Sequence, residues 1–307
     1  MLENVSNHKV VCFGEILWDL LPDKSLPGGA PMNVAYHLKK LGTNPALLTK
    51  IGLDDYGKKL VEILSTNGLS TEFFQMDYDH STGLVYAKPN EHNEVVYDIV
   101  FPSAWDFIEW NPTISDVVKQ AEFFVYGSLT SRNKISRETL YQLLDVAKTK
   151  VLDINLRPPH FNRAGVEYLL SNTNILKVNK AELELITGWF SQYDSTEDRM
   201  KTLQDQFKIE TIIVTLGGDG SVVNKGGKFY YDNGFKVQVA DTIGSGDAYL
   251  AGFLHQQINA ASITDSLLFA SSLGALIATY HGACPNYETS EINTLMNTNA
   301  LTNIQST

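Results

Sequence analysis

The segment Asp241–Ala248 holds the residue types that could do chemistry most directly. Gly244, Ser245 and Gly246 follow one another there, after a β-like run and before an amphipathic stretch that predicts a helix. Small residues let backbone N–H groups converge on one point, and a helix N-terminus adds about half a positive charge. Such a turn is suited to bind phosphate, or the charge that develops during phosphoryl transfer.

Asp247 falls in the first turn of this expected helix, beside the anion-binding residues. A carboxylate in that place could accept the proton of an attacking hydroxyl group. The alternative interpretation is an aspartate that only stabilises its helix N-terminus, next to glycines that only form a tight turn.

A second glycine-rich segment spans residues 28–35 and contains Gly28, Gly29 and Asn33. Two glycines permit the backbone to approach a ligand closely. The Asn33 amide can both donate and accept hydrogen bonds, which a polyol requires. The alternative is a helix cap that follows a Gly-Pro turn.

The elements that must position these residues alternate along the chain. Short apolar runs suit strands that are covered on both faces, and the longer amphipathic segments between them predict helices. This alternation predicts an α/β fold with βαβ units and a mainly parallel, twisted sheet. The expected strands are Val10–Phe13, Ala46–Ile51, Phe123–Tyr126, Val151–Ile154, Ile175–Val178 and Thr211–Leu216, with a further β-like run at Phe235–Val239. The expected helices include Asn33–Leu41, Asp55–Asn67, one capped by Ser136, Ser245–Gln257 and Thr264–Tyr280.

Two regions break this alternation. Glu15–Leu21 and Thr82–Phe101 predict β-structure without intervening helices, the second as a hairpin around residues 89–93. We expect one domain over residues 1–307, with inserted lid segments at about 15–27 and 82–104 that form a small β flap. Trp18 and Trp105 lie in these segments, either as core residues or as a wall over a sugar ring.

Composition limits the classes of partner. The chain has 307 residues, 43% of them hydrophobic, and a net charge of −11 from 24 Lys and Arg against 35 Asp and Glu. The acidic balance argues against nucleic acid and against anionic membranes as partners. Two cysteines, Cys12 and Cys284, are too few for a disulfide framework, and the N-terminus lacks the features of a signal peptide. We expect a cytoplasmic protein without a membrane span.

Taken together, the two glycine-rich segments resemble both signatures of the ribokinase-like (PfkB-type) carbohydrate kinases. The matching positions are Gly28, Gly29, Asn33, Ala35, Gly42 and Gly52 in the first, and Asp241, Gly244–Asp247, Ala251 and Gly252 in the second. The resemblance runs from about Val10 to Ser290. It implies a ribokinase-like fold and an ATP-dependent sugar kinase that needs Mg²⁺. It also implies a general base at Asp247, with Gly244, Ser245 and Gly246 around the transferring phosphoryl group.

Further positions match the same family. Asp19 matches its sugar-binding aspartate, which would act with Gly28, Gly29 and Asn33. Asn179 and Glu182 match its motif near the phosphates and Mg²⁺, where Glu182 would act through water, although this spacing is also a capping box. Residues 215–220 resemble its nucleotide-contacting loop, with Thr215, Gly217 and Gly220 as contacts. They are not a Walker A motif, and no G-x-G-x-x-G sequence follows the first strand, which disfavours a dehydrogenase.

The branch of the family rests on fewer residues. Residues 151–158 resemble the Asp-x-Asn-x-Arg segment of fructokinases, and residues 102–106 and 124–129 are similar to the same branch. Arg157 could present a planar guanidinium to phosphate oxygens, or it could be a surface arginine paired with a carboxylate. We expect fructose as the substrate. The alternatives are a 2-keto-3-deoxygluconate kinase, another sugar or nucleoside kinase, or an inert sugar- or nucleotide-binding regulator on this fold.

The resemblance also implies a potassium site and a dimer. Oxygens from Asp241, the backbone of Ile243 and a loop over residues 277–286 would bind the cation, and all-oxygen ligation suits such an ion. The positions implied in that loop are Ile277, Tyr280, Gly282 and Asn286. Edge strands of the lid could pair with those of a second copy in a homodimer.

Overall fold

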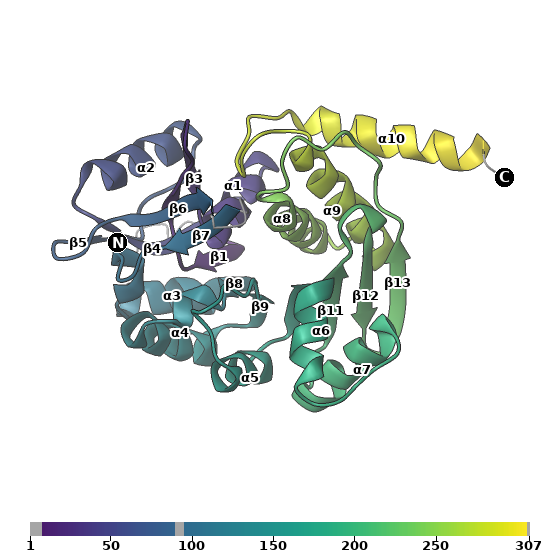
Figure 1. The fold of residues 1–307 in the computed structure, drawn as a ribbon, viewed down its shortest axis with the longest axis horizontal. Coiled ribbons are helices and arrows are strands. Elements are labelled where there is room, and N and C mark those ends of the chain that lie inside the picture. The colour runs from purple at the N-terminus through teal and green to yellow at the C-terminus, as the bar shows by residue number, and fades with distance from the viewer. Residues whose placement is uncertain (1–7, 90–94, 306–307) are drawn as a thin grey trace. The chain divides into compact units, whose positions relative to one another are not determined.

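The computed structural model describes residues 8–89 and 95–305, which fold into two compact units (Figure 1). The N-terminal unit contains the chain up to Lys39 together with residues 43–148. The C-terminal unit contains residues 40–42 and the chain from Thr149 onward. In Figure 1 the first unit runs from purple to teal, and the chain from Thr149 onward runs from teal through green to yellow. Strands and helices alternate in both units, which confirms the predicted α/β class.

The main sheet of the N-terminal unit has the strand order β8-β1-β4-β5, and its strands run parallel. All residues of β1 and β4 are buried, as expected for strands covered on both faces. The strands are β1 Val10–Phe13, β4 Ala46–Gly52, β5 Phe74–Asp77 and β8 Phe123–Gly127. The helices of this unit are α1 Ala30–Lys40, α2 Asp55–Thr66, α3 Pro112–Gln120 and α4 Lys134–Val146.

A second sheet in the same unit collects the two predicted β regions. Its order is β3-β2-β6-β7, in which β2 runs parallel to β6 and antiparallel to β3. The strands are β2 Leu17–Leu20, β3 Ser25–Gly28, β6 Gly83–Pro89 and β7 Val95–Ile99. β6 and β7 pair antiparallel, as the predicted hairpin requires, while residues 90–93 of its expected turn lie outside the described residues. We call these four strands the small sheet.

The sheet of the C-terminal unit has the order β13-β12-β11-β10-β9, and its last three strands in that order are parallel. Its strands are β9 Thr149–Asp153, β10 Ile175–Asn179, β11 Thr211–Thr215, β12 Ser221–Lys225 and β13 Lys228–Asp232. Its helices are α5 Arg163–Ser171, α6 Lys180–Gly188, α7 Thr196–Phe207, α8 Ser245–Ile258, α9 Ile263–Ala278 and α10 Thr289–Gln305.

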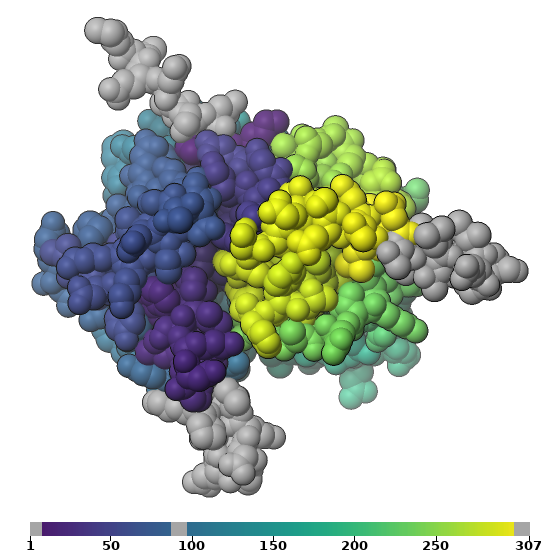
Figure 2. All heavy atoms as spheres, turned by 90° about the horizontal axis from the view of Figure 1, so that it is seen from above, coloured from purple at the N-terminus to yellow at the C-terminus, as the bar shows by residue number. Residues whose placement is uncertain are grey.

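Helices α8 and α9 lie side by side in the C-terminal unit (Figure 1). Gly252 permits this close packing, because a Cβ atom there would lie 3.1 Å from the Cα atom of Ala270. Helix α10 packs on α9, and its described side chains form part of the surface in Figure 2 (yellow). No helix within the described part of the chain is both long and apolar enough to cross a membrane.

Two local predictions are wrong. Phe235–Val239 is not a strand. Only its first residue is buried and Val239 is 58% exposed, so neither face of the run is covered. Ser136 does not cap α4, which begins at Lys134 after the cap residue Asn133. The buried Ser136 hydroxyl instead donates to the Trp105 carbonyl and accepts from the Ile108 N–H.

Asp54 connects helix α2 to Thr82, the residue before strand β6 of the small sheet. Its carboxylate caps α2 through the Gly57 N–H and also accepts from the N–H and hydroxyl of Thr82, each at 2.8 Å. Burial raises the pKa of Asp54, but the hydrogen bonds from Thr82, Gly57 and Tyr56 outweigh it and lower the pKa below its usual value. The carboxylate therefore stabilises the fold above the pKa of the unfolded chain, and this stabilisation is lost as the pH falls through the lower folded-state pKa.

We expect Asp54→Asn to reduce the free energy of unfolding at pH 7 by about 1 kcal/mol, the usual net contribution of a hydrogen bond, because asparagine can still cap the helix but has only one acceptor oxygen. The new NH₂ group would face donors of Thr82. The loss should shrink toward zero below pH ~4, where the unfolded-state aspartate is protonated. Urea unfolding at pH 7 and at pH 3 measures it, with the exposed neighbour Asp55→Asn as control. A loss that is equal at both pH values would contradict the argument.

Candidate active site

Asp19 lies on β2 and faces β3. Successive side chains of a strand point to opposite faces, so Asp19 and Trp18 are on different sides of the small sheet. A Cβ atom at Gly28 would collide with the Asp19 carboxylate, so the glycine leaves the room that this side chain occupies. The Trp18 indole N–H donates to the Tyr56 carbonyl at 3.0 Å, on the side of helix α2. Trp18 is therefore not a wall on the Asp19 side of the sheet.

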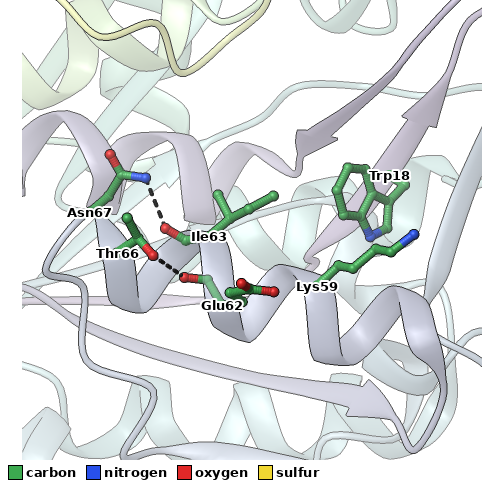
Figure 3. Close-up of a pocket in the computed structure, with 6 residues that line it drawn as sticks. All are labelled: Trp18, Lys59, Glu62, Ile63, Thr66 and Asn67. Atoms are coloured by element: carbon green, nitrogen blue, oxygen red, sulfur yellow. Dashed lines mark hydrogen bonds between the residues drawn. The ribbon is translucent and has the colours of Figure 1, made fainter.

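Figure 3 shows Trp18 at the edge of a groove along helix α2. The groove is lined by Trp18, Lys59, Glu62, Ile63, Thr66 and Asn67. The Thr66 hydroxyl and the Asn67 amide donate to carbonyls one turn earlier in the helix, so these polar groups already have intrahelical partners. Of Asp19, Gly28, Gly29 and Asn33, the residues predicted to bind the sugar, none lines this groove.

Trp105, the other tryptophan of the lid segments, is fully buried. It packs with Leu17 and Val85, and the Arg132 guanidinium lies 4.0 Å from its ring centroid. Of the two interpretations of Trp105, the structure supports core packing.

Gly29 and Asn33 come together at the start of α1. The Asn33 N–H donates to the Gly29 carbonyl at 2.9 Å, and the Asn33 side chain is buried. Gly29 has a φ of 113°, and a Cβ atom there would collide with the Glu15 carbonyl. Since β3 ends at Gly28, the N-terminal unit gathers Gly28, Gly29 and Asn33 near Asp19.

The turn at Gly244 opens helix α8 as predicted. Gly244 has a φ of 78°, in the left-handed region, and serves as the N-cap. The intrahelical ladder begins with the Ala248 N–H, which donates to the Gly244 carbonyl at 2.8 Å. The Ser245 N–H donates to the Thr242 carbonyl at 3.3 Å. Gly246 and Asp247 follow it in the first helical turn, where an α-helix offers its N–H groups no carbonyl of its own. The Ser245 hydroxyl oxygen is buried and meets no hydrogen-bond partner within the described residues.

Asp241 joins two segments predicted to hold a cation. One carboxylate oxygen accepts from the Ile243 N–H at 3.0 Å and the other from the Gly282 N–H at 3.2 Å. The Asp241 N–H in turn donates to the carbonyl of Ala278, which follows Ile277 at the end of α9. Asp241, Ile243 and the loop at Gly282 are thus neighbours.

The side chains of two other predicted cation residues point to other partners. The Tyr280 hydroxyl donates to Glu291 at 2.8 Å, and the Asn286 amide oxygen accepts from the Lys40 ammonium at 2.8 Å. The Tyr280 N–H donates to the Ile277 carbonyl. Tyr280 and Asn286 could therefore serve a cation through their backbone carbonyls rather than through their side chains.

The predicted nucleotide residues lie at the carboxyl ends of neighbouring strands. The register of β10 and β11 places Asn179 opposite Thr215. After Thr215 the chain turns sharply, and the Leu216 N–H donates to the Gly220 carbonyl at 2.8 Å. Gly217 and Gly220 have φ values of 64° and 89°, and a Cβ atom at Gly220 would collide with the Asp232 carbonyl. Gly220 therefore requires glycine, whereas at Gly217 the space is open and the backbone angle alone favours it.

Glu182 makes the capping box that was one of its two interpretations. The Asn179 side chain accepts from the Glu182 N–H, and a Glu182 carboxylate oxygen accepts from the Asn179 N–H, both at 2.9 Å. Its second oxygen accepts from the Leu156 N–H at 2.9 Å. Burial is the main cause that raises the pKa of Glu182 above its usual value. Since a carboxylate oxygen can accept further bonds, the capping box does not exclude a role beside the phosphates.

Arg157 follows directly after this contact. Its guanidinium is exposed and donates to the Leu156 carbonyl at 3.1 Å. The C-terminal unit thus brings Arg157 near Glu182, at the carboxyl ends of β9 and β10.

One charged pair in this unit was missed by sequence reasoning. Lys177 on β10 lies opposite Asp153 on β9, and its ammonium is 2.7 Å from a carboxylate oxygen of Asp153. Burial lowers the pKa of Lys177, but attraction to Asp153, Asp247 and Glu182 outweighs it and raises the pKa above its usual value. The signal was present, because each residue is a charge inside an apolar run expected to be covered on both faces.

A mainly parallel α/β fold in which a glycine turn opens a helix, with a carboxylate in the first turn, is typical of proteins that bind phosphate groups. Comparison with known proteins gives the family: the sequence profile described as pfkB family carbohydrate kinase matches residues 7–290. The chain belongs to this family, and it is therefore a phosphotransferase that acts on an alcohol group of a carbohydrate.

Relatives in plants and bacteria agree with this assignment. The chain is 31% identical to probable fructokinase-6, chloroplastic, of Arabidopsis thaliana, over 92% of this chain and 80% of that protein. It is 30% identical to fructokinase-1 of Zea mays, over 91% and 94% of the two chains. Among solved structures, a fructokinase with bound ATP from Xylella fastidiosa superposes with a TM-score of 0.86 at 21% identity, over 95% of this chain and 99% of that one. The predicted ribokinase-like fold is confirmed.

Proposed function

We propose that the chain is an ATP-dependent fructokinase, which transfers the γ-phosphoryl group of ATP to a primary hydroxyl of fructose. The observation that carries the proposal is the left-handed turn at Gly244, which opens α8 with Asp247 in its first turn. The probable fructokinase-6 of Arabidopsis thaliana and fructokinase-1 of Zea mays, matched over nine-tenths of this chain, support fructose as the acceptor. The Xylella fastidiosa neighbour, solved with ATP, supports the donor.

In the proposed reaction Asp247 accepts the proton of the hydroxyl as its oxygen attacks the γ-phosphorus atom. The bond from that phosphorus to the ADP oxygen breaks, and ADP leaves with the electron pair. The N–H groups of residues 244–247 stabilise the charge on the transferring group, which supplies a large share of catalysis in phosphoryl transfer. Arg157 would pair with phosphate oxygens. Asp19, Gly28, Gly29 and Asn33 of the N-terminal unit would orient the sugar.

We assign the nucleotide and Mg²⁺ to residues of the C-terminal unit. Asn179, Thr215, Gly217 and Gly220 would contact the nucleotide. No group of three or more His, Cys, Asp or Glu side chains is arranged to hold a metal in the residues that the structure describes. This fits Mg²⁺, which is commonly bound by one or two carboxylates together with water and substrate phosphates. Glu182 would hold Mg²⁺ through water, and the ion would neutralise charge on the phosphates.

The contacts of Asp241 support a potassium site formed with oxygens of Ile243, Ile277, Tyr280, Gly282 and Asn286. We expect kcat to be higher in KCl than in NaCl of equal ionic strength. Asp241→Asn should remove this difference, because its neutral amide attracts a cation less and places an NH₂ group against the N–H groups of Ile243 and Gly282. A variant that keeps the full potassium response would contradict the site.

A coupled ADP-release assay with a panel of acceptors tests the proposed function. The panel contains fructose, glucose, mannose, ribose, 2-keto-3-deoxygluconate and adenosine. Fructose should give the highest kcat/KM. A higher kcat/KM for 2-keto-3-deoxygluconate or adenosine would show that the protein is a kinase for that acceptor and not for fructose. Binding without turnover for every acceptor would instead support an inert regulator.

The small sheet supports a homodimer. Its edge strands β3 and β7 present backbone groups that a second copy could pair with. Sedimentation that shows only a 34.1 kDa species would contradict the dimer. The cytoplasm remains the proposed compartment. It agrees with the two cysteines, Cys12 and Cys284, neither of which is in a disulfide bond within the described residues.

A further inference from the structure

Lys177 lies against the turn that opens helix α8. A Cβ atom at Gly246 would be 2.9 Å from the Lys177 ammonium nitrogen, so the absence of a side chain at Gly246 leaves the room that the ammonium occupies. Lys177 comes from β10 and Gly246 from the first turn of α8, so the contact joins the sheet to the phosphate-binding turn. A small residue at position 246 thus also leaves space for the Lys177 side chain.

The ammonium is held in place from the strand side. Its bond to Asp153 is short, at 2.7 Å, and the two side chains are only 10% and 5% exposed. The other carboxylate oxygen of Asp153 is buried without a hydrogen-bond partner within the described residues. The carboxylates of Asp247 and Glu182 are also near enough to attract Lys177. The Lys177 ammonium thus interacts with several carboxylates in a buried region of low dielectric constant, where electrostatic attraction is stronger than in water.

We propose that Lys177 is a positioning residue for phosphoryl transfer: its ammonium, anchored by Asp153, fixes the first turn of α8 and adds positive charge beneath the phosphate-binding turn. It acts through Gly246 and Asp247. This proposal rests on the proposed kinase function of the same turn. It explains why a charged pair stands among the buried residues of β9 and β10, where apolar residues would pack at a lower cost in desolvation.

If the Lys177–Asp153 pair only stabilised the fold, its loss would lower stability but not kcat. The chain contains a second buried ion pair that distinguishes this structural role from a role in positioning. Lys50 on β4 is 3.4 Å from Asp77 on β5, and these side chains are also 10% and 5% exposed. The Lys50 ammonium donates to the Phe107 carbonyl and belongs to the N-terminal unit, which contains none of the residues assigned to the phosphate site. Lys50→Met therefore controls for the loss of a buried ion pair as such.

The test compares Lys177→Met, Lys177→Arg and Lys50→Met with the wild type, on whichever sugar the wild type phosphorylates. We expect Lys177→Met to lower kcat about 10–100-fold, the effect of a slightly misplaced catalytic group, with the KM for sugar changed less than about threefold. Lys177→Arg should recover part of kcat because it keeps the charge. Lys50→Met should lower the melting temperature but leave kcat within about threefold of the wild type. A kcat of Lys177→Met equal to that of Lys50→Met would overturn the proposal.

Two further measurements keep the test decisive. If Lys177→Met does not fold, Asp153→Asn replaces it: this change keeps the ammonium but weakens its anchor, so kcat should fall at unchanged KM, and an unchanged kcat would overturn the proposal. Titration calorimetry with AMPPNP needs no sugar, and Lys177→Met should bind this analogue more weakly than Lys50→Met does. Equal affinities would count against Lys177. A wild type without turnover on any sugar would contradict the proposed function instead.

Discussion

An Asp247→Asn variant is expected to lose sugar phosphorylation by about 10²–10⁴-fold in kcat, the usual contribution of a general base. Asparagine has nearly the same shape as aspartate, so the turn at Gly244 and the start of α8 should persist. Its amide cannot accept the proton of the attacking hydroxyl, so the alcohol must attack without that help. The KM values for sugar and ATP should change little, because the lost interaction belongs to the transition state.

Helix α9 supplies a matched control for this variant. Asp265 is the third residue of α9, as Asp247 is the third residue of α8, so both carboxylates face a helix N-terminus. Each should contribute about 0.3–1 kcal/mol through the helix dipole. Asp265→Asn should therefore lose similar stability at full kcat. If kcat of Asp247→Asn stayed within a few-fold of the wild type, Asp247 would not be the base.

Local patterns predicted the main elements well. The strand Val10–Phe13 and the start of α8 at Ser245 agree with the structure to the residue, because a continuous apolar run and a glycine turn before a helix are short-range signals. The run Phe235–Val239 alternates apolar and polar residues, as a strand covered on one face does, but it forms no strand, and only Phe235 in it is buried. Whether other elements pack over a segment depends on the tertiary fold, and the hydrophobic pattern of that segment alone does not predict it.

Pairing between distant segments was not available from the sequence. The expected hairpin of β6 and β7 is local, but the parallel pairing of β2 with β6 joins residues more than sixty positions apart in the chain. The same limit applied to the site. Gly244 and Asp247 belong to one motif and were predicted, whereas Lys177 and Asp153 meet only through the register of two strands. Charges inside strands that must be buried are the signal that could have found them.

Gly244→Ala is expected to impair both folding and catalysis. Gly244 has a φ of 78°, and a side chain in that left-handed region costs about 1–2 kcal/mol. In addition, the new Cβ atom would lie 2.6 Å from the Cα and Cβ atoms of Ala283, a distance that real Cβ atoms do not adopt. Because backbone must move to relieve this contact, the N–H groups of the turn leave their positions. We expect kcat to fall about 100-fold, as for a displacement of about 1 Å in a catalytic site.

Gly227, in the hairpin of β12 and β13, provides a control that has the backbone strain of Gly244→Ala without its steric collision. Its φ is 87°, but a Cβ atom there would meet no atom within 4 Å, so Gly227→Ala carries the strain alone. It should lose about 1–2 kcal/mol of stability and keep its kcat. Ala283 follows Gly282, whose N–H donates to Asp241, so the movement that Gly244→Ala forces should also weaken the potassium response. Urea unfolding and kcat in KCl and NaCl measure these effects, and equal kcat for the two alanine variants would show that the contact with Ala283 does not hold the phosphate-binding turn.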